Sequence, residues 1–133
     1  SAGDIAFIQY NADNSDNFAF VCLVDFNSGD KIYFTENEPG DIEGGEWECE
    51  WFVNSTIDKG TIITISNSDS DGTLGNATID IKGSLGLSSS GDGIWAYTGS
   101  DFGQTTTWIA AIGNNGSSNT WDSTEGLISS TIP

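Results

Sequence analysis

Short segments of β-branched and aromatic residues, each bounded by turn-forming residues, recur along the whole sequence and constrain its fold most strongly. Such segments are typical of β-strands. The Gly, Asn, Asp and Ser clusters between them favour turns, because these residues tolerate positive φ angles or hydrogen-bond to the nearby backbone. No segment shows the 3.6-residue periodicity of an amphipathic helix. The predicted strands are Ile5–Tyr10, Phe18–Val24, Lys31–Thr35, Trp47–Val53, Thr61–Ile65, Thr78–Ile81, Gly93–Tyr97 and Thr107–Ile112.

These segments predict one all-β domain over residues 1–133, an antiparallel β-sandwich of about eight strands. A chain of 133 residues is long enough to bury a sizeable core. Seven Phe, five Trp and three Tyr supply large apolar surfaces for that core. The sequence contains no internal repeat and no linker that would divide it into two domains.

Glutamates alternate with large apolar residues over residues 46–51, in the stretch EWECEW. Successive side chains of a strand point to opposite faces, so one set is predicted to enter the core. The other set forms a row of like charges that needs water, a cation or a cationic partner. The predicted core positions are Trp47, Cys49 and Trp51, and the predicted carboxylate row is Glu46, Glu48 and Glu50.

The charge of the chain is strongly negative, with 20 acidic residues against three basic ones and a formal net charge of −17. Phosphate backbones and anionic membrane surfaces repel such a protein, which argues against nucleic acid and membranes as partners. No apolar run approaches the roughly 18 residues of a membrane span, so no membrane insertion is expected. The charge favours cations as partners, or it serves solubility alone.

Three clusters of oxygen-bearing side chains are candidates for calcium binding. Residues 67–72 read Asn-Ser-Asp-Ser-Asp-Gly, the first half of a calcium loop, but Thr78 occupies the closing position, so a residue such as Asp80 would have to complete the site. Residues 11–17 and 36–50 form the second and third clusters. Polar turns and a solvated acidic face are the alternatives. The predicted ligands are Asn67, Asp69, Asp71 and Asp80, together with Glu36, Glu38, Asp41 and Glu43.

Catalysis finds little support in the sequence. Without histidine, the chain cannot form a Ser-His-Asp or Cys-His arrangement. It has no arginine and no glycine-rich phosphate loop followed by lysine, which argues against phosphoryl transfer. Two carboxylates can hydrolyse glycosides, but nothing singles out a pair. We therefore expect a protein that is not an enzyme.

A tryptophan in a polar loop is the best candidate for direct ligand contact. Trp121 lies in 114–123, a run of Asn, Gly, Ser, Thr and Asp that predicts an exposed loop, although the ring could also fold back onto the core. A tryptophan ring can stack on the apolar face of a sugar. Trp95 and Trp108 alternate with aliphatic residues and are predicted to pack in the core. The predicted ligand-binding residues are Trp121, Asn114, Asn115, Asn119 and Asp122.

Two cysteines, Cys22 and Cys49, lie inside predicted strands. In a secreted chain an even number of cysteines favours one disulfide bond between them. The alternative is two separate buried thiols, since free cysteine is a common core residue. A zinc site is not expected, because two cysteines without histidine cannot complete an ordinary tetrahedral site.

Several segments resemble the lamin-tail type of secreted domain. They are GDIAFIQYN (3–11), KIYFTEN (31–37), DKGTIITIS (58–66), LGLSSSGDGIWAYTG (85–99) and WIAAIG (108–113). The resemblance implies an immunoglobulin-like β-sandwich of the kind used as a module in large secreted proteins of bacteria and algae, and it implies nothing about chemistry. The residues that match the hairpin motif of the family are Ser88, Ser90, Gly91, Asp92, Ile94 and Tyr97, among which Gly91 and Asp92 are expected to form the turn.

These observations together predict a secreted or cell-surface module that binds calcium and recognises a ligand, most plausibly a carbohydrate, as a lectin does. The chain begins without Met, and three glycosylation sequons begin at Asn54, Asn76 and Asn115, as expected of a processed, secreted form. An acidic adhesive, extracellular-matrix or mineral-associated module without a sugar site is the alternative. A purely architectural domain of a larger protein is a third reading.

Overall fold

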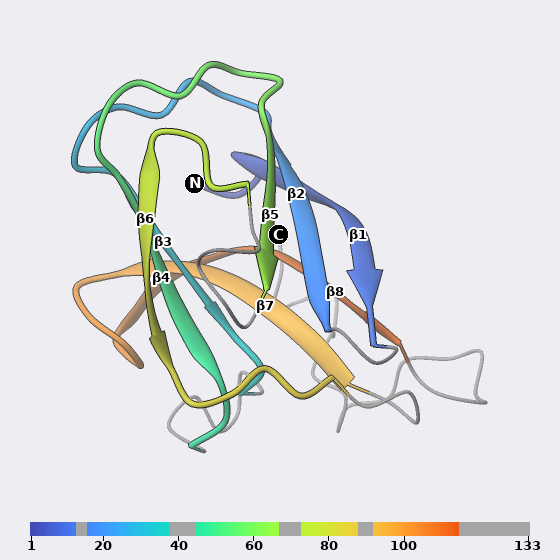
Figure 1. The fold of residues 1–133 in the computed structure, drawn as a ribbon. Helices are drawn as coiled ribbons and strands as arrows, with labels where there is room; N and C mark the ends of the chain where they lie inside the picture. The colour runs from blue at the N-terminus through green and yellow to red at the C-terminus, as the bar shows by residue number, and fades with distance from the viewer. Residues whose placement is uncertain (13–15, 38–44, 67–72, 88–91, 115–133) are drawn as a thin grey trace.

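The computed structural model of the chain describes residues 1–12, 16–37, 45–66, 73–87 and 92–114 (Figure 1). Within these ranges the chain forms eight strands and no helix. The strands are β1 (Ile5–Asn11), β2 (Asn17–Cys22), β3 (Lys31–Thr35), β4 (Glu48–Val53), β5 (Ile62–Ser66), β6 (Ala77–Lys82), β7 (Asp92–Gly99) and β8 (Thr105–Asn114).

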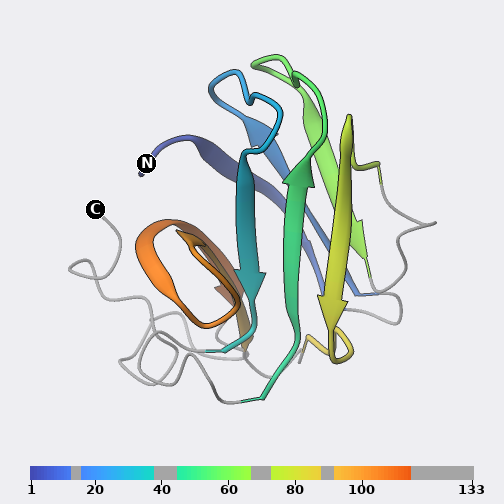
Figure 2. The same ribbon diagram turned by 90° about the vertical axis from the view of Figure 1, so that its left-hand side faces the viewer.

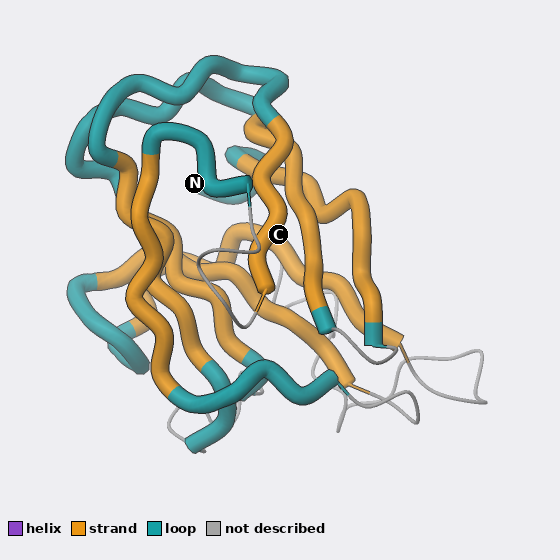
Figure 3. Tube along the Cα trace, viewed as in Figure 1, coloured by secondary structure: helices purple, strands orange, loops and turns teal. Residues whose placement is uncertain are grey.

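Two antiparallel sheets pack face to face (Figure 1, Figure 3). One has the strand order β1-β2-β5 and the other has the order β6-β4-β3-β7-β8. The neighbours β1-β2-β5 and β3-β7-β8 follow the A-B-E and C-F-G orders of immunoglobulin-like sandwiches. The all-β antiparallel sandwich of about eight strands that the sequence predicts is therefore confirmed.

The connections 23–30 and 54–61 lie side by side at one end of the sandwich, which we call the loop end (Figure 3). Phe26 and Ile57 exchange backbone hydrogen bonds there, each with an N to O distance of 2.9 Å. Gly29 adopts a φ of 94°, a conformation that residues with a Cβ rarely adopt, and its N–H donates to the carbonyl of Val53 at 2.9 Å. The two connections thus hold each other in place.

Large aromatic side chains fill the core between the sheets. Phe20 on β2 stacks on Phe34 on β3, with ring centroids 5.1 Å apart, and contacts Trp51 on β4 edge-on at 5.2 Å. Such aromatic pairs stabilise a core beyond the area that they bury. Trp47, Cys49 and Trp51 are all fully buried in this core, which confirms the prediction for these three residues.

The outer face of the five-stranded sheet carries a second layer of aromatic residues. Tyr33 on β3 and Tyr97 on β7 pair across the strands and are fully buried, although they point away from the core between the sheets. The β7–β8 hairpin, orange in Figure 2, curls back beside β3. The Gly103 N–H donates to the Tyr97 hydroxyl at 2.8 Å, and the Phe102 ring contacts Tyr33 edge-on at 5.2 Å. Trp108 on β8 packs against Tyr97.

Three predictions about this face need correction. Trp95 is buried and Trp108 is half-buried, but both belong to the outer face and not to the core between the sheets. Glu46 is exposed and Glu50 is half-buried, as a solvated row requires, yet only 9% of Glu48 is exposed. Burial raises the pKa of Glu48, because its surroundings replace water around the charged form. A solvated row of glutamates is therefore wrong at Glu48.

The two cysteines are buried free thiols and do not form the disulfide that the sequence favours. Cys22 ends β2 at the loop end, where its N–H donates to the carbonyl of Thr61 at 2.9 Å. Cys49 is the second residue of β4 and lies near the opposite end of the sandwich. It belongs to the five-stranded sheet, where it pairs with Phe34, whereas Cys22 belongs to the three-stranded sheet. The thiols differ in sheet and in height along the strands, so the close Cβ approach that a disulfide needs is absent. The alternative of two separate thiols is correct.

Candidate functional site

Carboxylates from three separate parts of the chain gather at the end of the sandwich opposite to the loop end. β2 begins at Asn17, β3 ends at Thr35 and β7 begins at Asp92. The antiparallel pairing of β3 with β7 brings Glu36 to within two residues of the level of Asp92, and the two side chains share a hydrogen bond. Asp16 precedes β2 at the same end. We call the group of Asp16, Glu36 and Asp92 the carboxylate end.

Two consecutive backbone N–H groups each hold one of these carboxylates. The Gly86 N–H donates to Glu36 Oε2 at 3.3 Å, and the Leu87 N–H donates to Asp16 Oδ2 at 2.6 Å. Leu85 and Leu87 are buried in the core, which fixes the segment that presents these N–H groups. The carboxylates are therefore anchored to the fold and do not hang freely in solvent.

The Glu36 carboxyl group lies in an unfavourable environment for its charged form. Only 4% of Glu36 is exposed. Burial raises its pKa to about 7, against the opposing effect of the Gly86 N–H, and the negative charges of Asp92 and Glu46 and a hydrogen bond with Asp92 raise it further. A positive charge bound at this position would relieve that repulsion.

Close to Glu36, hydrogen bonds connect the residues that precede 38–44 with the residues that follow them. The Asn37 N–H donates to Thr35 Oγ1 at 2.9 Å, and Asn37 Oδ1 accepts the Glu46 N–H at 3.0 Å. The Glu36 N–H donates to the carbonyl of Trp47 at 3.0 Å. Asn37 is almost fully buried, so this polar network forms part of the fold itself.

The predicted calcium ligands are distributed unevenly over the structure. Glu36 belongs to the carboxylate end, whereas Asp80 faces outward from the middle of β6, opposite Glu50 on β4. Within the described ranges, no group of three or more Cys, Asp or Glu side chains could hold a metal ion. Asn67, Asp69, Asp71, Glu38, Asp41 and Glu43 lie outside the described residues.

Most of the predicted ligand-binding residues also lie outside the described part of the chain. Asn114 is the last residue of β8 and pairs with Asp92 at the carboxylate end. The chain therefore enters the segment that contains Trp121 from this end of the sandwich. Trp121, Asn115, Asn119 and Asp122 are not among the described residues, nor are Ser88, Ser90 and Gly91 of the family motif.

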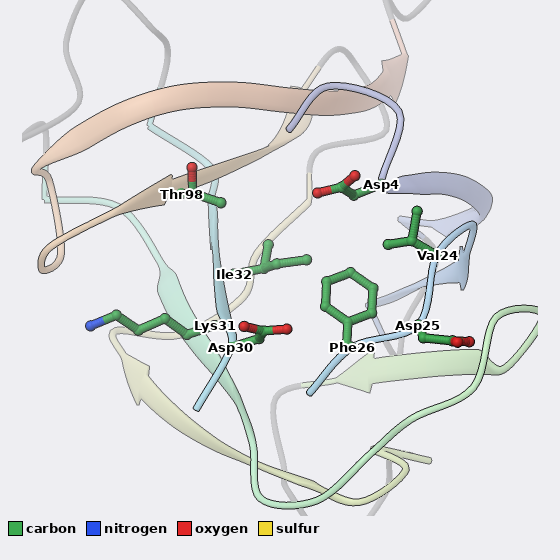
Figure 4. A pocket seen from close by; sticks show the side chains of 8 residues that line it. All are labelled: Asp4, Val24, Asp25, Phe26, Asp30, Lys31, Ile32 and Thr98. Atoms are coloured by element: carbon green, nitrogen blue, oxygen red, sulfur yellow. The ribbon is translucent and has the colours of Figure 1, made fainter. Parts of the chain in front are cut away.

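A pocket of about 200 Å³ opens at the loop end, which the sequence did not predict (Figure 4). Its floor is apolar, with Phe26 only 6% and Ile32 only 2% exposed. Figure 4 shows the carboxylates of Asp4 and Asp30 beside this floor, whereas the carboxylate of Asp25 lies at the rim and points away from Phe26. The residues that line the pocket are Asp4, Val24, Asp25, Phe26, Asp30, Lys31, Ile32 and Thr98.

Comparisons of the chain with family models, with curated proteins and with solved structures yield no match. The resemblance to lamin-tail domains thus stays a prediction from the sequence motifs. In the described part of the chain, no helix has the length and apolar character needed to cross a membrane.

Proposed function

We propose that this domain is a secreted or cell-surface recognition module that binds calcium at the carboxylate end and a carbohydrate beside it, without enzymatic activity. The observation that carries the proposal is the anchoring of Asp16 and Glu36 by consecutive backbone N–H groups, next to Asp92. Calcium prefers six to eight oxygen ligands, and anchored carboxylates supply some of them at little entropic cost.

The remaining ligands would come from segments that join the described strands at this end. β3 leads into residues 38–44, and β5 ends at Ser66, which pairs with Asn17 beside Asp16. These segments carry the predicted ligands Glu38, Asp41, Glu43, Asn67, Asp69 and Asp71. Calcium bound here would offset the repulsion among carboxylates that are otherwise close together.

The carbohydrate part of the proposal rests on the segment after β8. A bound calcium ion keeps coordination positions that sugar hydroxyls can occupy. Trp121 supplies a large flat ring and the neighbouring Asn115, Asn119 and Asp122 supply hydrogen-bonding groups, in a segment that starts at the carboxylate end. Calcium and sugar would then share one binding surface.

Thermal unfolding in EDTA, in millimolar calcium and in millimolar magnesium tests the metal site. A site occupied at 100 times its Kd stabilises the folded state by about 2.7 kcal/mol, which corresponds to a rise in Tm of several degrees. Asp16→Asn should reduce the calcium-dependent rise, and Asp101→Asn, which removes an exposed carboxylate from the β7–β8 turn, should preserve it. Equal effects of calcium and magnesium would contradict a specific site.

Glycan-array binding with and without EDTA then tests the carbohydrate. We expect Trp121→Ala to abolish glycan binding while the calcium-dependent rise in Tm persists. Glycan binding that survives both EDTA and Trp121→Ala would place the sugar elsewhere.

An acidic adhesive or mineral-associated role is the second candidate, and one observation favours it. Glu50 on β4 and Asp80 on β6 are directly paired across strands on the outer face, and Asp80 is exposed. Such like-charged neighbours on a sheet destabilise it unless cations or solvent screen them. Calcium-dependent adsorption to a mineral surface that Asp80→Asn weakens and Trp121→Ala spares would support this role.

A further inference from the structure

The pocket at the loop end is formed mainly by residues 24–32, to which Asp4 and Thr98 are added from other parts of the chain. Asp4 precedes β1 and is attached to the 23–30 connection, since the Leu23 N–H donates to its carbonyl at 2.8 Å. Asp30 precedes β3, and the Val53 N–H donates to its carbonyl at 2.8 Å. The backbone of Asp4 and Asp30 beside the pocket is therefore tied to neighbouring segments (Figure 4).

Two of the carboxylates use one oxygen each to hold the loops. Asp25 Oδ1 accepts the Lys59 N–H at 2.7 Å, and Asp30 Oδ2 accepts the Asn27 N–H at 2.8 Å. Within the described part of the chain, the other oxygen of each carboxylate accepts no hydrogen bond. Asp4 interacts with the amino and hydroxyl groups of Ser1. Asp30 therefore offers a carboxylate oxygen beside the apolar floor, and Asp25 adds a negative charge at the rim.

The one lysine in the pocket lining does not neutralise these carboxylates. The side chain of Lys31 extends away from the pocket (Figure 4). Its Nζ donates to the carbonyl of Ser100 at 3.3 Å and lies 5.5 Å from the centroid of the Tyr33 ring. The N-terminal ammonium group of Ser1 pairs with Asp4, which leaves the charges of Asp25 and Asp30 to make the pocket negative, on a protein whose formal net charge is −17. Such a pocket attracts cationic ligands.

From this geometry we propose that the pocket binds a lysine or arginine side chain of a basic peptide. The cationic head group would donate hydrogen bonds to Asp30 and be attracted by the nearby charge of Asp25, and the aliphatic stem would contact the apolar floor of Phe26 and Ile32. Long basic side chains combine these two characters, an apolar stem and a charged tip. A volume of about 200 Å³ suits one such side chain. This site is separate from the carboxylate end, at the opposite end of the sandwich.

NMR titration of the ¹⁵N-labelled protein in EDTA tests the proposal. The ligands are three acetylated and amidated peptides, Gly-Gly-Lys-Gly-Gly, its arginine analogue and its norleucine analogue, with free butylammonium as a fourth. We expect saturable shifts of the amides of Phe26, Asn27 and Lys59 with the lysine or arginine peptide. The norleucine peptide, which lacks the charge, should cause none.

Matched variants separate pocket binding from general attraction to an acidic protein. Asp25→Asn/Asp30→Asn keeps the acceptors for the Asn27 and Lys59 N–H groups and should weaken binding at least tenfold. Asp80→Asn/Asp101→Asn changes the net charge equally at exposed sites outside the pocket and should change affinity less than twofold. Val24→Trp, which fills the pocket without changing charge, should also abolish binding.

The opposite results would overturn the proposal. An equal loss in both double variants would mean attraction to the overall charge only. Stronger binding of butylammonium than of either peptide would assign the pocket to a small free amine and not to a peptide. Saturable shifts at the same amides with neutral oligosaccharides alone would assign it to a sugar.

Discussion

The rings of Tyr33 and Tyr97 stack on the outer face of the five-stranded sheet, with centroids 5.2 Å apart and planes inclined by 16°. The β7–β8 turn closes over this pair through Phe102 and the Gly103 N–H. Lys82 adds a cation–π contact, with its Nζ 4.3 Å from the centroid of the Phe102 ring. A turn that would otherwise project into solvent is thereby attached to the sheet.

Replacing Tyr97 by Phe should destabilise the fold by about 1–2 kcal/mol, because the Gly103 N–H loses its acceptor in a partly buried position. Denaturant unfolding measures the loss. Hydrogen exchange should show faster exchange of the Gly103 amide in particular. Unchanged exchange at Gly103 would mean that the hydroxyl does not hold the turn.

Gly99 should not tolerate a side chain. A Cβ on Gly99 would lie 1.9 Å from the carbonyl oxygen of Gln104, a backbone atom that cannot move without disturbing the hairpin. We expect Gly99→Ala to cost about 3 kcal/mol or more. Gly86→Ala is the matched control, since its Cβ would meet only the carbonyl of Ser84 at 3.9 Å, and it should cost less than about 1 kcal/mol. Similar losses in both variants would contradict this view of the hairpin.

Glu36→Gln should stabilise the calcium-free protein more at pH 8 than at pH 5. The pKa of Glu36 rises from 4.5 to about 7 on folding, so the folded state holds more protons than the unfolded state between these values. Stability of the native chain therefore falls as the pH rises through this window, and the cost is fully present above pH 7.

A neutral glutamine avoids this cost and can still accept the Gly86 N–H. The advantage of the variant at pH 8 is up to about 3 kcal/mol. Thermal unfolding in EDTA at both pH values measures it. If the difference in Tm between the variant and the native chain is the same at both pH values, Glu36 titrates normally.

Both thiols should resist modification until the protein unfolds. Burial raises the pKa of Cys22 to about 11, and burial, together with the charges of Asp80 and Glu50, raises the pKa of Cys49 further. The reactive thiolate is then scarce at pH 8. Ellman's reagent should react slowly with the native protein and titrate two thiols per chain in guanidinium chloride. Titration of no thiol after unfolding without reductant would indicate a disulfide.

The strands were predictable because their residue types fit a pleated, half-buried surface. The first and last residues of the strands were less predictable. Leu23 and Val24 continue the apolar run of β2 but are exposed, because the chain turns after Cys22 to join the loop end. β8 begins at Thr105, two residues earlier than its apolar pattern indicates, since Thr105 pairs with Gly99 across the hairpin.

The outer aromatic layer could not be predicted from alternation alone. In β3 both faces carry large apolar side chains, with Ile32 and Phe34 on one and Tyr33 on the other. Only the return of the β7–β8 turn decides that Tyr33 is buried as well. The same alternation predicts that Glu48 is exposed, whereas it is buried in the structure.

The two acidic sites differed in how much of them was predictable. Glu36 stood out because seven carboxylates fall within 15 residues of sequence. Asp25 and Asp30 belong to one connection between β2 and β3, and only the fold brings Asp4, which precedes β1, next to them. The Asp-rich turns were visible in the sequence, but their common location depends on sheet order.

β3 separates the two ends of the molecule, with Asp30 just before it and Glu36 just after it. Six residues of extended chain span roughly 20 Å, well beyond the Debye length of about 8 Å at physiological ionic strength. Charges gained or lost at one end are therefore screened from the other. If both proposed sites bind their ligands, the domain would act as a bivalent connector, in which a ligand at one end neither competes with nor strengthens binding at the opposite end.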